Sequence, residues 1–182
     1  MQDNIKLNET IKGYYFLEQD GKIIAKGNNL IVNDGRDFIY YNLLSKIGLI
    51  NNDENEYKDY NFYKIYADGK KASSGSPVSD YMTIPTTRLA DLNQSNPLLS
   101  YNISKESTSV GAYISKDTDN RRLKLSLSIV GDSQSYCITE FFVTIKNQDN
   151  ENSDEKLFSR FLIDPIYLTA GSSYNLVYYI GF

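Results

Sequence analysis

The sequence predicts a mainly β fold: an antiparallel β-sandwich of jelly-roll or immunoglobulin-like type, with about eight to ten strands and one α-helix near residues 34–47. Three observations favour this class. Apolar and polar residues alternate over residues 121–130, which is the pattern of a half-buried strand. Further β-rich runs follow along the chain, separated by short turn-forming segments. Only one segment has the four-residue apolar spacing of an amphipathic helix.

The clearest pair of strands lies between residues 121 and 146, and we predict that it forms a long antiparallel hairpin. The first strand places four aliphatic side chains on one face: Leu123, Leu125, Leu127 and Ile129. Residues 131–135 are rich in turn-forming types, and residues 136–146 are the second β-rich run. The single cysteine, Cys137, lies in that run and is expected to be a small buried apolar side chain.

A second hairpin is predicted near the start of the chain. Residues 11–18 and 21–26 are strand candidates, and the Asp20-Gly21 pair between them is typical of a type I′ turn. Further strand candidates follow at residues 62–67, 86–91, 98–103, 110–114, 157–163 and 174–182. We expect residues 1–182 to form a single β-sandwich domain, with an N-terminal arm (residues 1–10) and a long loop (residues 68–84) as contact elements.

The predicted helix, residues 34–47, is expected to pack against the sheet. Asn33 or Asp34 can cap its first turn, and Gly48 provides a stop at its C-terminal end. Its apolar side chains form one stripe: Phe38, Ile39, Leu43, Leu44 and Ile47. A stripe of this kind belongs to a core far more often than to a ligand site.

Charge and composition disfavour several classes of function. A formal net charge of −4 and a pI near 4.9 argue against binding to nucleic acid or to an anionic membrane by long-range attraction. The chain has no histidine, which removes the usual general base near neutral pH and the commonest zinc ligand. The first residues lack the regions of a signal peptide, and no apolar run is long enough for a bilayer span. We therefore expect a soluble protein.

The sequence contains no G-x-S-x-G elbow, no H-E-x-x-H pair and no Gly-rich phosphate loop. Glu140 lies among apolar residues, and a pair of carboxylates can hydrolyse a glycoside. A structural role is more frequent for such a residue, on the polar face of its strand or paired with Arg88 or Arg160. Residues 117–120 and 149–155 are rich in oxygen atoms but do not match the calcium-binding loop. We expect no catalytic residue, no bound metal and no cofactor.

Tyrosine usage is unusual, with 16 tyrosines and no tryptophan. Tyr57, Tyr60, Tyr81 and Tyr101 lie near loops rich in Asn and Asp, where exposed rings could stack on a sugar. The same rings would serve equally well as anchors of a protein–protein interface. Without tryptophan, the interface is the favoured alternative.

Several motifs occur in a characteristic order, beginning with a strand that enters a helix through an Asn-Asp-Gly-Arg turn and ending with a tyrosine-rich terminal strand. They are Gly27–Arg36, Ile65–Gly69 with the later Arg88, Ile138–Phe141, Leu157–Phe161 and Leu176–Phe182. This order resembles that of small virion structural proteins of tailed bacteriophages, which occur in neck, tail, baseplate or fibre-attachment regions. The similarity extends over most of residues 27–182.

The resemblance implies a non-enzymatic β-sandwich protein that repeats around the axis of a virion. We expect a homo-oligomer located in the virion, whose partners are other virion structural proteins and neither nucleic acid nor a membrane. The structural and interface candidates are Arg36, Arg88, Glu140, Arg160, Tyr66, Tyr81 and Phe182. Residue-by-residue matching makes the three arginines and the glutamate candidates for buried or interface ion pairs. The alternative function is a carbohydrate-binding module of a phage fibre or cell-surface protein, and a glycosidase ranks third.

Overall fold

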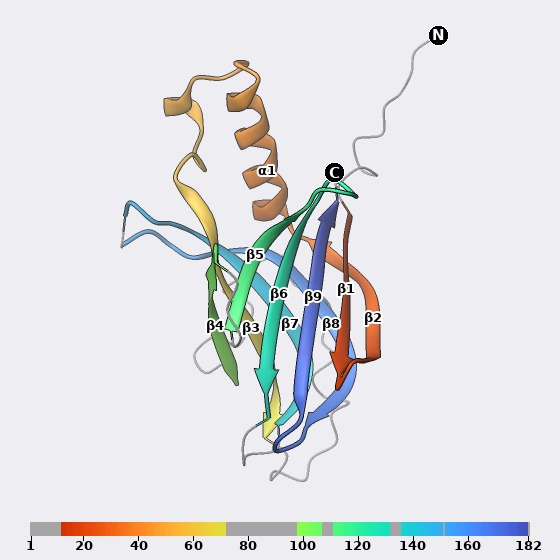
Figure 1. The fold of residues 1–182 in the computed structure, drawn as a ribbon. Coiled ribbons are helices and arrows are strands. Elements are labelled where there is room, and N and C mark those ends of the chain that lie inside the picture. The colour runs from red at the N-terminus through yellow and green to blue at the C-terminus, as the bar shows by residue number, and fades with distance from the viewer. Residues whose placement is uncertain (1–11, 72–97, 107–110, 132–135, 151, 182) are drawn as a thin grey trace.

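The computed structural model describes residues 12–71, 98–106, 111–131, 136–150 and 152–181 (Figure 1). These residues form nine β-strands, one α-helix and a short 3-10 helix at Asn52–Glu54. The strands are β1 (Lys12–Gln19), β2 (Lys22–Ile31), β3 (Tyr60–Lys71), β4 (Leu99–Ser104), β5 (Gly111–Asp117), β6 (Arg122–Val130), β7 (Tyr136–Asn147), β8 (Lys156–Leu168) and β9 (Ser173–Gly181). The helix α1 (Asn33–Lys46) follows β2 directly. The prediction of a mainly β fold with one helix is confirmed.

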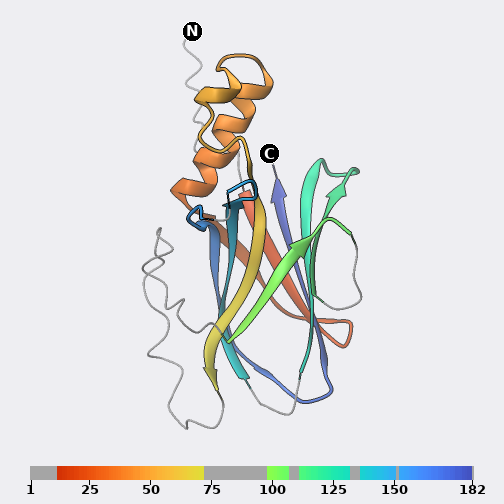
Figure 2. The ribbon, with the colours of Figure 1, turned by 90° about the vertical axis from the view of Figure 1, so that its left-hand side faces the viewer.

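The nine strands form a closed ring in the order β1-β2-β8-β7-β3-β4-β5-β6-β9. One sheet contains β2, β1, β9, β6, β5 and β4, and the other contains β2, β8, β7, β3 and β4. The two layers expected of a sandwich therefore share β2 and β4, which joins them into a barrel (Figure 2). Both joins are short. The β2–β8 join is antiparallel and the β4–β5 join is parallel, and each has only two residue pairs in register.

The predicted hairpin between residues 121 and 146 is wrong in its pairing, although both strands exist. β6 pairs with β5 and β9, whereas β7 pairs with β3 and β8 in the other sheet. The chain thus crosses from one sheet to the other after Val130. The burial patterns explain the difference, because β6 has one buried and one partly exposed face, while β7 is buried on both faces. A strand buried on both faces belongs in the middle of a sheet with cover on each side.

The predicted hairpin at the start of the chain is confirmed. β1 and β2 pair antiparallel, and Asp20 and Gly21 both have positive φ, 50° and 79°. This is the backbone that a type I′ turn requires.

Two strands extend beyond their predicted ends. β3 continues past Asp68-Gly69 to Lys71 with a register shift at that point, so residues 68–71 of the expected contact loop belong to a strand. β8 continues past Asp164-Pro165 to Leu168. The rest of the expected loop, the N-terminal arm and the strand candidate at residues 86–91 lie outside the described residues.

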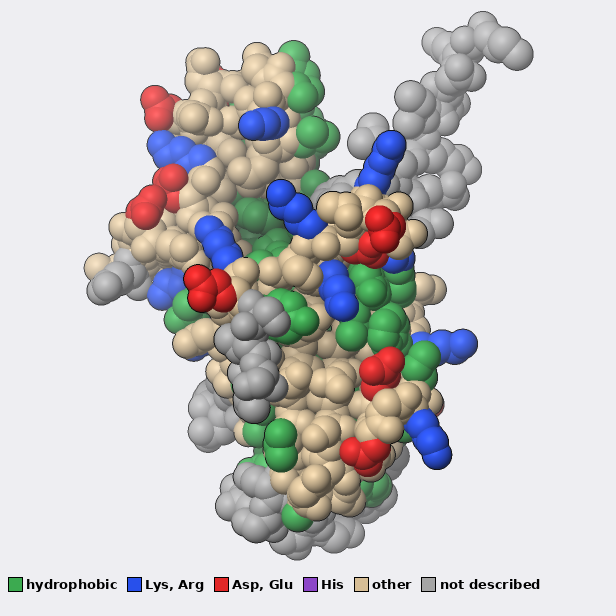
Figure 3. Space-filling view, viewed as in Figure 1, with side chains coloured by type: hydrophobic (Ala, Val, Ile, Leu, Met, Phe, Trp, Pro, Cys, Tyr) green, Lys and Arg blue, Asp and Glu red, His purple; other side chains and the backbone are tan. Residues whose placement is uncertain are grey.

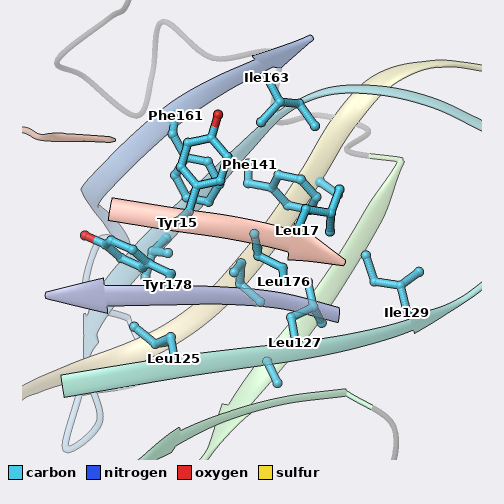
Figure 4. Close-up of a cluster of buried hydrophobic side chains, with 14 of the residues drawn as sticks. Tyr15, Leu17, Leu125, Leu127, Ile129, Phe141, Phe161, Ile163, Leu176 and Tyr178 are labelled. Atoms are coloured by element: carbon cyan, nitrogen blue, oxygen red, sulfur yellow. The ribbon is translucent and has the colours of Figure 1, made fainter. Parts of the chain in front are cut away.

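The barrel interior is the main core. Figure 4 shows side chains from β1, β6, β7, β8 and β9 converging there, and the Tyr15 ring stacks on Phe161 with centroids 4.5 Å apart. Cys137 is buried, as predicted. A small group of buried polar side chains interrupts this core: the Tyr178 hydroxyl lies near Asn29 and Ser159, and none of the three has a well-formed hydrogen bond. Burial raises the pKa of Tyr178.

The helix α1 is attached to the barrel at its first turn. The Val32 amide donates a hydrogen bond to the Phe158 carbonyl oxygen (3.1 Å), and Gly35 packs directly on the β8 backbone. The expected side-chain cap from Asn33 or Asp34 is absent, because Val32 occupies the capping position and makes no such bond. Within the described chain, no helix combines the length and the hydropathy that crossing a bilayer would need.

Only part of the apolar stripe of α1 contacts the core, which corrects the sequence-based expectation. Phe38 and Ile39 pack against the barrel core, whereas Leu43 is 55% exposed and Ile47 is 57% exposed. The physical reason is the attachment at the first turn, from which the rest of the helix projects beyond the end of the barrel (Figures 1 and 2).

Replacing Gly35 with Ala should destabilise the protein, although the same change inside a helix usually stabilises it by about 1 kcal/mol. A Cβ at position 35 would lie 2.2 Å from the Phe158 carbonyl oxygen, so α1 and β8 must move apart. We expect a loss of about 1–3 kcal/mol in the free energy of unfolding, measured by urea titration. The control, Arg36→Ala at the exposed neighbouring position, should change it by less than about 0.5 kcal/mol. Unchanged or increased stability of Gly35→Ala would contradict the close contact.

Candidate docking surface

An apolar groove lies where α1 meets the end of the barrel. It has a volume of about 380 Å³ and is lined by Phe38, Ile39, Asn42, Leu43, Phe62, Leu123, Phe158 and Ile180. We call it the helix groove. Asn42 is the only polar residue in this lining, and the hollow between α1 and the barrel contains apolar side chains in Figure 3. A concave apolar surface of this kind is typical of a binding site.

The floor of the helix groove is a cluster of aromatic rings. Phe38 packs edge-to-face on Phe62 and Phe158, with centroids 5.8 and 6.1 Å apart, and the latter two rings lie 4.8 Å apart. Edge-to-face pairs at these distances are favourable, and the rings come from three different elements. The floor is therefore preformed.

The groove continues into an exposed apolar face of the helix. Tyr40, Leu43 and Ile47 follow the spacing of one helical face, and Leu49 comes shortly after the helix end. Their exposed fractions range from 51% to 70%. We call these four residues the α1 face. Figure 3 shows apolar side chains along one edge of the helix. A contiguous exposed apolar patch is uncommon on a monomer and marks an interaction site.

The segment after α1 packs on another side of the helix. The Asn55 side-chain amide donates to Asn42 Oδ1 (3.2 Å), and the Ser45 hydroxyl donates to Asn52 Oδ1 (2.6 Å). Ring contacts of Tyr57 with Phe38 and Tyr41 add apolar contact. These contacts fix the orientation of the helix relative to the segment that follows it. The described residues do not cover the α1 face.

The structure corrects the expected sugar-stacking surface. Tyr57 is buried and Tyr60 is half-buried, and the Lys156 ammonium lies over both rings at 4.4 and 5.2 Å. Neither ring is free to stack on a ligand. Tyr101 is half-buried, and Tyr81 lies outside the described residues.

Glu140 has one of the two arginine partners expected from the sequence. Arg160 Nε lies 2.6 Å from Glu140 Oε2, and the arginine side chain is only 3% exposed. Asp68 is opposite Glu140 in the β3–β7 register, so two carboxylates and one guanidinium meet on the same sheet. A buried pair of this kind is weak evidence for added stability, because desolvation offsets the attraction between its charges.

Tyr66 belongs to a second, smaller apolar cluster on the face of the sheet opposite the barrel interior. The cluster consists of Val32, Tyr66, Phe142 and Leu157, and the rings of Tyr66 and Phe142 stack 4.6 Å apart. The Tyr66 hydroxyl donates to Glu155 (2.7 Å), which also accepts from Thr144. Burial and this hydrogen bond raise the pKa of Tyr66. Tyr66 therefore has a structural role within the chain.

The other sequence candidates are not brought together by the described structure. Arg36 is exposed on the first turn of α1 and makes no ion pair with any described residue. Arg88, Tyr81 and Phe182 lie outside the described residues, so their interface roles stay predictions.

The acidic turn at residues 117–120 is held by internal bonds. Asp117 pairs with Arg122 and accepts hydrogen bonds from Asn120. In the other acidic segment, Asn147 Oδ1 accepts from the amides of Asp149 and Asn150. Among the residues that the structure describes, no group of three or more Cys, Asp or Glu side chains could hold a metal ion.

Sequence reasoning missed the main feature of this surface, because it assigned Leu43 and Ile47 to the core. The periodic spacing identifies which residues share a face of the helix, but not what covers that face. The signal that was available is the neighbouring Gly35, since a glycine in a helix marks a close backbone approach. Such an approach attaches a helix at one point.

Replacing Asp68 with Asn should reduce the pH dependence of stability. Burial of the carboxyl raises the pKa of Asp68 above its ordinary 3.8 and the charge of Glu140 adds to this, although the Gly69 and Leu98 amides and Arg160 act in the opposite direction. A carboxyl with a raised pKa binds its proton more tightly in the folded state. Its contribution to stability is therefore fully present below the ordinary pKa and is lost as the pH rises through the raised value.

Asn cannot titrate, and it keeps the oxygen that accepts from the Gly69 amide. We expect the stability of the Asp68→Asn variant, relative to wild type, to increase from about pH 3 to about pH 7 in urea titrations. A relative stability that is constant or decreases over this range would contradict the burial of this carboxyl.

No protein-family model, no curated protein and no solved structure matches this chain.

Proposed function

We propose that the protein is a non-enzymatic structural component of a tailed-bacteriophage virion, which works by self-association and by docking to other virion proteins. The observation that carries the docking part is the α1 face together with the helix groove. The motif order from Gly27 to Phe182 supports the virion part by resemblance.

The α1 face suits a permanent contact. Fully burying a Leu or Ile side chain contributes about 1.5–3 kcal/mol, so covering Leu43, Ile47 and Leu49 is a substantial driving force. A surface exposed in this way is costly in water and favours association with a partner. The preformed aromatic floor lowers the ordering cost of that association.

The α1 face itself contains no charged residue, and the Glu140–Arg160 pair is buried on a sheet of the barrel. Interfaces of obligate assemblies have apolar centres from which charged residues are depleted. The composition of the α1 face fits that description.

Replacing Leu43 with Lys should weaken assembly of the purified protein. A charge in the middle of an apolar contact loses the burial energy and adds a desolvation cost. We expect the assembly constant to fall by about tenfold or more, measured by light scattering over a range of concentrations.

Val130→Lys is the matched control, because Val130 is 53% exposed and Leu43 is 55% exposed. Val130 also lies far from the groove, at the opposite end of β6 from the groove residue Leu123. Both variants should keep the far-UV circular dichroism of the folded wild-type protein, which separates a loss of assembly from a loss of the fold. A wild-type protein that stays monomeric at every concentration, or equal effects of the two substitutions, would overturn the proposal.

One observation favours the second candidate, a carbohydrate-binding module. A cleft of about 490 Å³ lies between the ends of β3, β4 and β7, and its lining is mixed: Asn61, Phe62, Ile103, Ser104, Lys105, Glu106, Ile114 and Gln148. Polar side chains beside an aromatic ring can bind a sugar.

A glycan array tests the second candidate. Clear, competable binding by the wild-type protein, lost in Glu106→Ala and retained in Leu43→Lys, would favour the module over the assembly protein. Absence of binding to every glycan would reject it.

A further inference from the structure

The helix groove is the right size for a few side chains rather than for a whole helix. Its volume of about 380 Å³ is at the low end of the range of about 300–1,000 Å³ for pockets that hold organic groups. An α-helix with its side chains is about 10–12 Å across, which is too wide for such a pocket. An extended segment that inserts two aliphatic side chains fits its size and its apolar lining.

The chain enters the barrel immediately beside this groove. Lys12, the first described residue, pairs with Gly181, and Gly13 pairs with Ile180 of the groove lining. Ile180 pairs in turn with Leu123, which is also in the lining. The start of β1 is therefore at the same end of the barrel as α1 (Figure 1), and residues 1–11 precede it in the sequence.

The sequence of residues 1–11 has the pattern that such a groove requires. Ile5 and Leu7 are two positions apart, so they would lie on the same side of an extended segment, with Lys6 on the opposite side. The segment contains no other pair of aliphatic residues at this spacing. Aliphatic side chains are complementary to a lining made of Phe, Leu and Ile.

We propose that the helix groove receives residues 1–11 of a neighbouring copy of this chain, with Ile5 and Leu7 as the buried side chains. This inference rests on the proposed self-association and names the segment and the site through which it occurs.

The position of the groove favours a neighbouring copy over the same chain. Because Gly13, Ile180 and Leu123 are in register, the barrel side of the groove lies at the level of residue 13, and a strand continued backwards from Lys12 passes beyond that side. Reaching the groove of the same chain requires a sharp reversal between Leu7 and Lys12, and Asn8 is the only residue of a turn-forming type within residues 8–11. An extended segment of this length reaches up to about 36–40 Å, which is longer than the roughly 21 Å of α1.

Disulfide trapping between two full-length variants tests the inference directly. One chain carries Leu7→Cys, the other carries Leu43→Cys and a tag that changes its mass, and the mixture is oxidised under mild conditions. Ile5→Cys serves as a second donor in case Leu7 is not the residue nearest to Leu43. The native Cys137 is 2% exposed and is retained. Val130→Cys in place of Leu43→Cys is the matched control, since its exposure is similar.

A mixed disulfide dimer on a non-reducing gel, formed with Leu43→Cys and not with Val130→Cys, supports the inference. The double variant Leu7→Cys/Leu43→Cys separates the two arrangements, because a disulfide within one monomer, without the mixed dimer, would assign the segment to its own groove and overturn the proposal. A protein that is multimeric by light scattering but forms no disulfide from either donor overturns this inference and leaves the proposed function standing. A strictly monomeric wild-type protein overturns both.

Discussion

The contact between the first turn of α1 and β8 determines the rest of the surface. Gly35 allows the helix backbone to lie against the Phe158 carbonyl oxygen, and the Val32 amide bonds to the same oxygen. With the helix attached at that point, Phe38 and Ile39 contact the barrel core and the later turns project beyond it. The helix groove and the α1 face are both consequences of this single attachment. A helix lying flat on the sheet would bury its apolar stripe and leave neither.

The strands of the barrel differ in how many of their faces are buried, and this difference separates the groove from the doubly covered sheet. Side chains of β6 and β9 line the barrel interior. The same two strands also contain the groove residues Leu123 and Ile180. β7 instead is buried on both faces, with Phe141 in the interior and Phe142 in the cluster around Tyr66. The Glu140–Arg160 pair lies on this doubly covered sheet, where a charged pair is acceptable only when each partner is satisfied. One sheet is therefore the rigid support, and the apolar contact surface lies at the end of the barrel.

The sequence patterns predicted which segments form strands and the helix better than they predicted which strands pair with each other. The Asp20-Gly21 turn and the alternation of Leu125, Leu127 and Ile129 are local signals, and the structure shows both the turn and the buried face. The pairing of β6 with β9 joins residues 43 to 59 positions apart, which alternation cannot specify. The exposure of Leu43 depends on where the helix is attached, and this is a property of the tertiary contact at Gly35. The sequence therefore predicts the apolar stripe of α1, but it does not predict that part of this stripe is exposed.

The proposed exchange of residues 1–11 between copies restricts how those copies can be arranged. Both Lys12 and the groove residues Leu123 and Ile180 are at the same end of the barrel, so two copies that exchange segments must bring these ends together. Stacking of copies head to tail along the barrel axis is incompatible with this contact, because it would place the opposite end, near Val130, against the groove. Two arrangements satisfy the constraint: a face-to-face pair with reciprocal exchange, or a ring in which every helix points to the same side. Since the segment and the groove are different surfaces, the ring contact is heterologous and closes only if the rotation between neighbours divides a full turn.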